Sequence, residues 1–250
     1  MQTDLLSSYS SKAPGRPWGL AATFGLSAVI WYTMELVQAA MGLSMDTVLQ
    51  ATGWVDVSQN TQALNFAIIT CITTVLCAAL VVAAAGLRDG LEPRAYLALG
   101  AVPGRQLLHW LIITAIVVAQ TDLALYLVKG ELLPQQWVEV YRTVQSPLLF
   151  WFALVVATPI FEELLFRGFI FEGIRASPLG GFGAVTLTAL AWTLVHHESD
   201  PFEFSIILII GVMLGVARLR TGSVWVTMAM HMLHNLISTG EIVWLAAMAE

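Results

Sequence analysis

Long apolar segments, separated by short polar ones, occupy most of the chain. Each has about 18 to 28 residues, enough for an α-helix to cross the ~30 Å hydrocarbon core of a bilayer. The pattern therefore predicts an all-α polytopic membrane protein. About seven transmembrane helices are expected, at residues 17–41, 62–87, 106–128, 147–175, 180–197, 202–219 and 224–250.

The composition supports a membrane location and argues against a nucleic-acid partner. Hydrophobic residues make up 58% of the chain and charged residues 11%, whereas a soluble domain carries about 25% charged residues. The mean hydropathy of +0.77 agrees. The net charge of −6 is unfavourable for nucleic acid, so the lipid bilayer is the expected partner.

Lys and Arg are distributed unevenly over the polar segments, which predicts an orientation. With the N-terminus in the cytosol, residues 1–16 form a cytosolic tail, residues 42–61 form an outer loop, and the C-terminus lies outside. Only Lys129 and Arg142 then fall outside, and Arg167 lies within the membrane. The basic residues expected on the cytosolic side are Lys12, Arg16, Arg88, Arg94, Arg105, Arg175, Arg218 and Arg220.

Glu162, Glu163 and Arg167 form a polar island inside the predicted helix 147–175. On insertion scales, each charged group at the centre of a membrane helix costs roughly 3 kcal/mol of insertion free energy. Glu163 and Arg167 are four residues apart, in the order that favours an ion pair. Glu162 points ~140° away from Arg167, and an unpaired carboxylate inside a membrane indicates a functional site. Pro159 removes a backbone hydrogen bond and predicts a bend before this island.

Two further polar islands lie on later helices. His196 follows Trp192 at the end of the fifth segment, and His231 and Asn235 share one face of the seventh. At a rise of ~1.5 Å per residue, all three lie near the middle of the bilayer, as Glu162 does. We therefore expect one buried site in the C-terminal half. Other polar residues of the apolar segments are interpreted as structural: Glu35, His109, Asp122, His197 and His234.

The residue types at these islands are those that hydrolysis needs. A carboxylate can act as general base toward water, and a histidine can orient that water or donate a proton. An imidazole and an amide can stabilise an oxyanion. The same set could instead hold a metal, since His and carboxylate are zinc ligands.

Taken in order, the three islands form a pattern: Glu162-Glu163-x-x-x-Arg167, Trp192-x-x-x-His196 and His231-x-x-x-Asn235. The pattern resembles the CAAX protease and bacteriocin-processing group of intramembrane proteases, also called the type II CAAX protease or Abi family. A Trp stands at the position where Phe is usual, an exchange expected to affect packing and not chemistry. The resemblance divides the chain into N-terminal membrane helices, 17–144, and a CAAX-protease-like catalytic region, 145–248.

The resemblance implies hydrolysis of peptide bonds within the membrane. Glu162 and His196 would activate the water, and His231 and Asn235 would form the oxyanion hole. The substrate would be a membrane-associated peptide or protein, which eukaryotic relatives require to be prenylated. The short loops indicate a bacterial inner-membrane protein.

Metal dependence is left open by the resemblance, because the family has been described both as metalloproteases and as glutamate proteases. The chain has no His-Glu-x-x-His motif, so we favour the metal-free mechanism with no cofactor. In the zinc-dependent alternative, Glu162, His196 and His231 would be the ligands. Glu163 and Arg167 would be structural support in either case.

A non-enzymatic membrane protein is the alternative class. A transporter often carries inverted repeats with broken helices in both halves, whereas the polar islands here lie only in the C-terminal half. A pseudoprotease scaffold should lack a catalytic residue, and all four are present. Both observations favour the protease.

Overall fold

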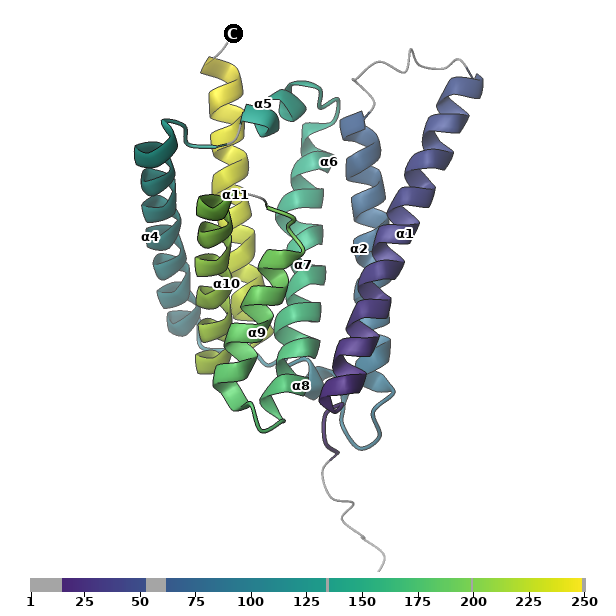
Figure 1. The fold of residues 1–250 in the computed structure, drawn as a ribbon, viewed down its shortest axis with the longest axis vertical. Helices are drawn as coiled ribbons and strands as arrows, with labels where there is room; N and C mark the ends of the chain where they lie inside the picture. The colour runs from purple at the N-terminus through teal and green to yellow at the C-terminus, as the bar shows by residue number, and fades with distance from the viewer. Residues whose placement is uncertain (1–14, 53–61, 134, 199, 249–250) are drawn as a thin grey trace, which may run out of the picture.

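The computed structural model describes residues 15–52, 62–133, 135–198 and 200–248, and its regular elements there are all helices (Figure 1). This confirms the predicted all-α polytopic fold. The long helices are α1 (Leu20–Thr52), α2 (Gln62–Gly86), α4 (Gly104–Lys129), a helix over residues 147–175, α9 (Gly180–Leu194), α10 (Pro201–Thr221) and α11 (Val224–Met248). Two short helices, α3 (Pro93–Tyr96) and α5 (Gln135–Arg142), lie in the connections.

Five helices in the described part of the chain are long and apolar enough to cross a membrane. They are Leu20–Leu43 within α1, Leu64–Gly86 within α2, α4, the helix 147–175 and α10. Helix α9 is apolar but has only 15 residues. Helix α11 is continuous, but its run of apolar residues is interrupted by two histidines, an asparagine and Glu241. The structure thus supports five of the seven predicted spans, and the other two stay predictions.

The first predicted boundary is wrong. Residues 42–52 were expected in a polar loop, but α1 continues through them to Thr52. No Pro or Gly lies between Leu43 and Thr52, and polar residues alone do not end a helix, because most of them have fair helix propensity. Residues 53–61 of that loop and residues 1–14 of the predicted tail lie outside the described residues.

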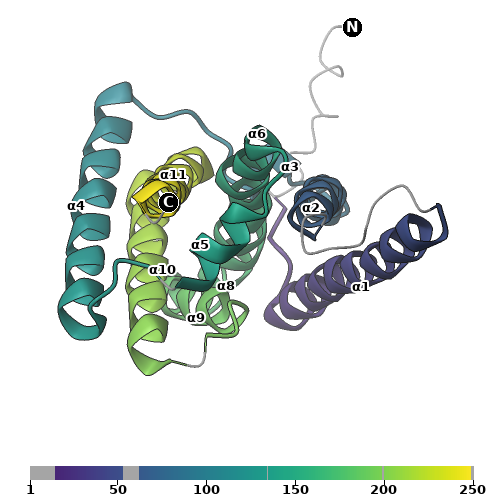
Figure 2. The ribbon, with the colours of Figure 1, turned by 90° about the horizontal axis from the view of Figure 1, so that it is seen from above.

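The helix over residues 147–175, called the central helix from here on, runs through the middle of the bundle. Figure 2 shows α1 and α2 on one side of it and α11, α10 and α4 on the other. Both α2 and α11 pack against its middle. Helices α4 and α10 are seen lengthwise in Figure 2, where α2 and α11 are seen end-on, so they are tilted strongly relative to those two.

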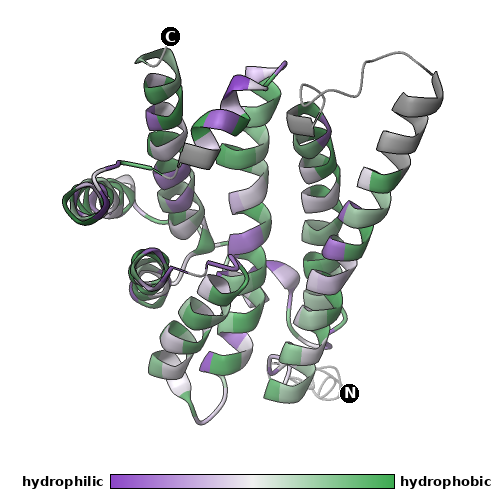
Figure 3. Cartoon of the chain, turned by 45° about the horizontal axis from the view of Figure 1, so that its top comes forward, coloured by the Kyte–Doolittle hydropathy of each residue, from purple (hydrophilic) through white to green (hydrophobic). Residues whose placement is uncertain are grey.

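The central helix is continuous but not uniformly α-helical. It consists of α6 (Pro147–Trp151), η2 (Phe152–Ala157), α7 (Thr158–Glu163), η3 (Leu164–Ile170) and α8 (Phe171–Arg175), where η2 and η3 are π-helical. The first π-helical stretch, η2, ends two residues before Pro159, the residue expected to disturb the hydrogen bonding. Such π-helical turns often accompany functional sites. Figure 3 shows hydrophilic bands within the otherwise apolar central helix and α11.

Candidate active site

The Glu163–Arg167 pair is fully buried, with both side chains 0% exposed. Arg167 Nη1 donates to Glu163 Oε1 at 3.0 Å, as the spacing of four residues predicts. Arg167 Nη2 donates to the Gly211 carbonyl of α10 at 3.1 Å, and its guanidinium carbon lies 4.9 Å from the centre of the Trp192 ring. The pair therefore joins the central helix to α9 and α10.

Glu163 also contacts a predicted catalytic residue. His231 Nδ1 lies 3.1 Å from the same Oε1 atom, and His231 is only 3% exposed. A nitrogen facing a carboxylate carries the proton, so Nε2 of the neutral ring is left with its lone pair. Glu163 thus orients His231 as well as neutralising Arg167, a role that the spacing within one helix did not indicate.

Glu162 takes a separate partner. Its Oε2 accepts a hydrogen bond from Trp192 Nε1 at 2.6 Å, and no hydrogen bond or ion pair joins it to Arg167 within the described residues. The expectation that Trp192 affects packing only is corrected by this contact, because a Phe ring has no N–H to donate. The carboxylate is buried, at 9% exposure, and has one oxygen fixed by a rigid indole.

His196 lies in the turn after α9, not within a helix as predicted, because α9 ends at Leu194 and the chain turns through His197 at a φ of +53°. Its Nδ1 lies 2.7 Å from the Trp192 carbonyl. That carbonyl is one of the last four of the helix, which have no partner in the next turn. His196 therefore caps α9 through Nδ1–H, and its Nε2 lone pair is directed elsewhere.

Trp192 is the centre of the site. Its ring lies 4.5 Å from the His196 ring and 5.4 Å from the His231 ring, both edge-to-face. Its indole N–H binds Glu162, and Arg167 lies near its ring. The structure therefore gathers Glu162, His196 and His231 around one indole, although they belong to three separate segments.

Asn235 is held by a backbone carbonyl that Pro159 leaves without a donor. In a π-helical turn the Leu154 carbonyl would bond the N–H of residue 159, and Pro159 has none. Asn235 Nδ2 donates to that carbonyl at 2.8 Å instead. Its Oδ1 lies 3.2 Å from His234 Nδ1, so one amide N–H remains for a ligand.

His234 adjoins the candidate site, a position that the sequence interpretation did not give it. It was interpreted as a packing histidine, yet its ring lies 6.5 Å from that of His231 and it fixes the amide of Asn235. The available signal was its position three residues after His231, which places both rings on one face of α11.

The loop that carries His196 is tied to α4. Lys129 pairs with Asp200 at 2.9 Å and with Glu203. Asp200 also caps α10 by accepting from the backbone N–H groups of Phe202 and Glu203. The hydrogen bond from Lys129 keeps the pKa of Asp200 below its ordinary value.

The candidate site meets one requirement of a zinc centre but not the other. His196 and His231 each direct Nδ1 toward an oxygen, which is how zinc-ligating histidines are usually oriented. However, no three His, Cys, Asp or Glu side chains of the described residues lie close enough together to hold a metal ion. The arrangement therefore does not assemble the three ligands of the zinc alternative.

The comparison with known families covers the region just described. Residues 144–237 match a family model described as Type II CAAX prenyl endopeptidase Rce1-like. The match contains all three motifs, but it is less than half of the chain and leaves out α1, α2 and α4. No curated protein and no solved structure matches the chain. The match agrees with the resemblance that the motifs carry: residues 144–237, which include the central helix, α9, α10 and the first part of α11, are similar to the type II CAAX prenyl endopeptidase Rce1-like family.

Proposed function

We propose that the protein is an intramembrane endopeptidase that cleaves membrane-associated peptides or proteins with a water activated by Glu162 and His196. The observation that carries the proposal is the grouping at Trp192, where one buried carboxylate and two histidine rings surround a single indole. A carboxylate and an imidazole held together by a rigid ring can share the proton transfers that hydrolysis requires.

The proposed reaction follows from these positions. Glu162 takes a proton from water, and the resulting hydroxide forms a bond to the scissile carbonyl carbon. The negative charge then moves to the carbonyl oxygen, where the remaining N–H of Asn235 and a protonated His231 stabilise it. Glu163 holds the ring of His231 in place for this role, because its carboxylate oxygen lies 3.1 Å from Nδ1. When the C–N bond breaks, the amine receives the proton that Glu162 accepted, with His196 orienting the transfer.

The cellular setting is part of the same proposal. The protein is an integral membrane protein by the apolarity of its helices and by its family. We place it in a bacterial inner membrane with the N-terminus in the cytosol, because the basic residues collect in the loops that this orientation puts inside.

The test is a comparison of membrane peptides from cells that carry the native protein or Glu162→Gln. The amide keeps the shape of the side chain and removes the base, so the cleaved products should disappear while the protein stays folded. Quantitative mass spectrometry would identify the products and thereby the substrate. Normal cleavage by Glu162→Gln would rule out this mechanism.

A further inference from the structure

A cavity with charged side chains in its lining lies away from the candidate active site. It has a volume of about 640 Å³ and is bordered by α3, the loop that follows it, α8 and the end of α10. In Figure 1 this is the lower end of the bundle, where the central helix ends and α9 begins. Because two apolar spans end here, the cavity opens at the level of a membrane surface.

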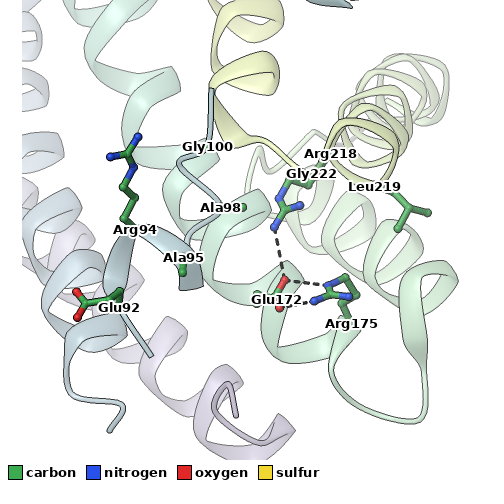
Figure 4. Close-up of a pocket in the computed structure, with 10 residues that line it drawn as sticks. All are labelled: Glu92, Arg94, Ala95, Ala98, Gly100, Glu172, Arg175, Arg218, Leu219 and Gly222. Carbon is green, nitrogen blue, oxygen red and sulfur yellow. Dashed lines mark hydrogen bonds and ion pairs between the residues drawn. The ribbon is translucent and has the colours of Figure 1, made fainter. Parts of the chain in front are cut away.

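The charged side chains of the cavity leave an excess of positive charge. Arg175 donates two hydrogen bonds to Glu172, at 2.9 and 2.6 Å, and Arg218 shares the same carboxylate at 3.5 Å. Figure 4 shows these three side chains on one wall and Arg94 on the opposite wall. With Glu92, the lining holds three guanidinium groups and two carboxylates, a net charge of +1.

Arg94 is free to bind an anion. Its Nε donates to the Leu99 carbonyl, and no carboxylate pairs with it in the part of the chain that the structure describes. Glu172, in contrast, is shared between two guanidinium groups. The cavity therefore has guanidinium donors on both walls, and its carboxylates are too few to pair with each guanidinium group separately.

The cavity is also preformed. Three bonds hold its loop to the start of α11: Val224 N–H to Ala98 O, Ser223 Oγ to Gly100 O and Trp225 Nε1 to Leu99 O, at 3.0, 2.6 and 3.2 Å. Arg218, only 4% exposed, is fixed by the carbonyl of Arg167 at 2.9 Å and by the Phe171 ring. Because these donors are already fixed, less conformational entropy is lost when a ligand binds.

We propose that this cavity binds the phosphate group of an anionic phospholipid headgroup. Guanidinium groups match phosphate oxygens in charge and in planar geometry. Basic pockets between membrane helices at the headgroup level are suited to such lipids. Leu219, which lines the cavity, and the adjoining Trp225 are 42% and 52% exposed, so an apolar surface for the lipid chains adjoins the charged one.

The test uses the full chain purified in detergent and measures its thermal midpoint with added lipid. Phosphatidylglycerol should raise the midpoint and phosphatidylcholine should not. Arg175→Gln and Arg94→Gln should each weaken phosphatidylglycerol binding about tenfold, the effect of losing one charge-assisted contact. Arg218 is left unchanged because it also holds the Arg167 carbonyl.

Arg220→Gln is the matched control. It removes the same charge from an exposed position at the same end of α10 but does not line the cavity. Equal loss in Arg220→Gln, or equal midpoints with the two lipids for the unchanged protein, would overturn the proposal. Inorganic phosphate is tested separately. A rise in the thermal midpoint with phosphate alone, absent in the two cavity variants, would support the anion site and assign it to a soluble ligand. No part of this test depends on proteolytic activity.

Discussion

The N-terminal helices and the site region differ in how far along the chain their buried polar groups find hydrogen-bond partners. In α2 and α4, the buried threonines donate to carbonyls three or four residues earlier in the same helix, as Thr74 does to Thr70 and Thr114 does to Trp110. The site region has local contacts too, such as Glu163 with Arg167, but its predicted catalytic residues also take partners 30 to 81 residues away, as Glu162 does with Trp192 and Asn235 with Leu154. The N-terminal arrangement is local and replaceable, whereas the site depends on several helices being in place together.

Glu163→Ala should give the largest loss of stability. It would leave Arg167 buried and without its carboxylate, and removing one partner of a buried pair costs about 3–5 kcal/mol. It would also release His231. The free energy of unfolding in mixed micelles measures the effect, with Glu162→Gln as the control that should stay within about 1 kcal/mol of the unchanged protein. Equal stability of Glu163→Ala would mean that Arg167 finds another partner.

Part of this network could be predicted from the sequence. The Glu163–Arg167 contact follows from a spacing of four on one helix, and the separation of Glu162 follows from the same geometry. The contact of Glu163 with His231 could not be derived, because it depends on how α11 packs against the central helix. The length of α1 was also missed, since the hydrophobic pattern locates the membrane and not the end of the helix.

Trp192 shows a different limit of sequence reasoning. An aromatic exchange at a buried position suggests a change of packing, but whether the indole N–H meets an acceptor depends on a residue 30 positions away. His196 is similar, because its place in a turn follows from the end of α9 at Leu194. The orientation in the membrane and the catalytic roles stay predictions.

Asn235→Ala tests whether the long-range contacts serve catalysis. If Asn235 provides an oxyanion donor, its loss should lower turnover about 10²- to 10³-fold. It should also leave the Leu154 carbonyl without its donor, so stability must be measured on the same sample. Turnover would be followed on the peptide identified with Glu162→Gln.

The same assay resolves metal dependence. Under the metal-free mechanism, activity should survive exhaustive treatment with a membrane-permeant chelator. Under the zinc alternative it should vanish and return with added zinc, because three protein ligands and a water form a catalytic site. One zinc per active protein, together with near-normal turnover of Asn235→Ala, would overturn the metal-free mechanism and leave the protease assignment standing.

Trp192→Phe should have a smaller effect confined to the site. It keeps a ring beside His196 and His231 but removes the N–H that fixes Glu162. A hydrogen bond to a charged group contributes about 1.5–3 kcal/mol, so kcat should fall about tenfold or more with KM little changed. Trp244→Phe, on the exposed surface of α11, is the control. A parallel loss in both variants would show a general effect of removing tryptophan.

Thr74→Val should have the smallest effect, although Thr74 is as buried as His231, at 3% exposure each. Its hydroxyl donates to the Thr70 carbonyl at 2.7 Å, and that carbonyl also accepts the backbone N–H of the next helical turn. Valine has the same shape, so no cavity forms and no carbonyl loses its only donor. Side-chain hydrogen bonds within membranes average about 0.6 kcal/mol, and the unfolding assay used for Glu163→Ala should detect a change no larger than about 1 kcal/mol. A loss comparable to that of Glu163→Ala would contradict the distinction between local and long-range polar contacts, because it would show that burial alone sets the cost.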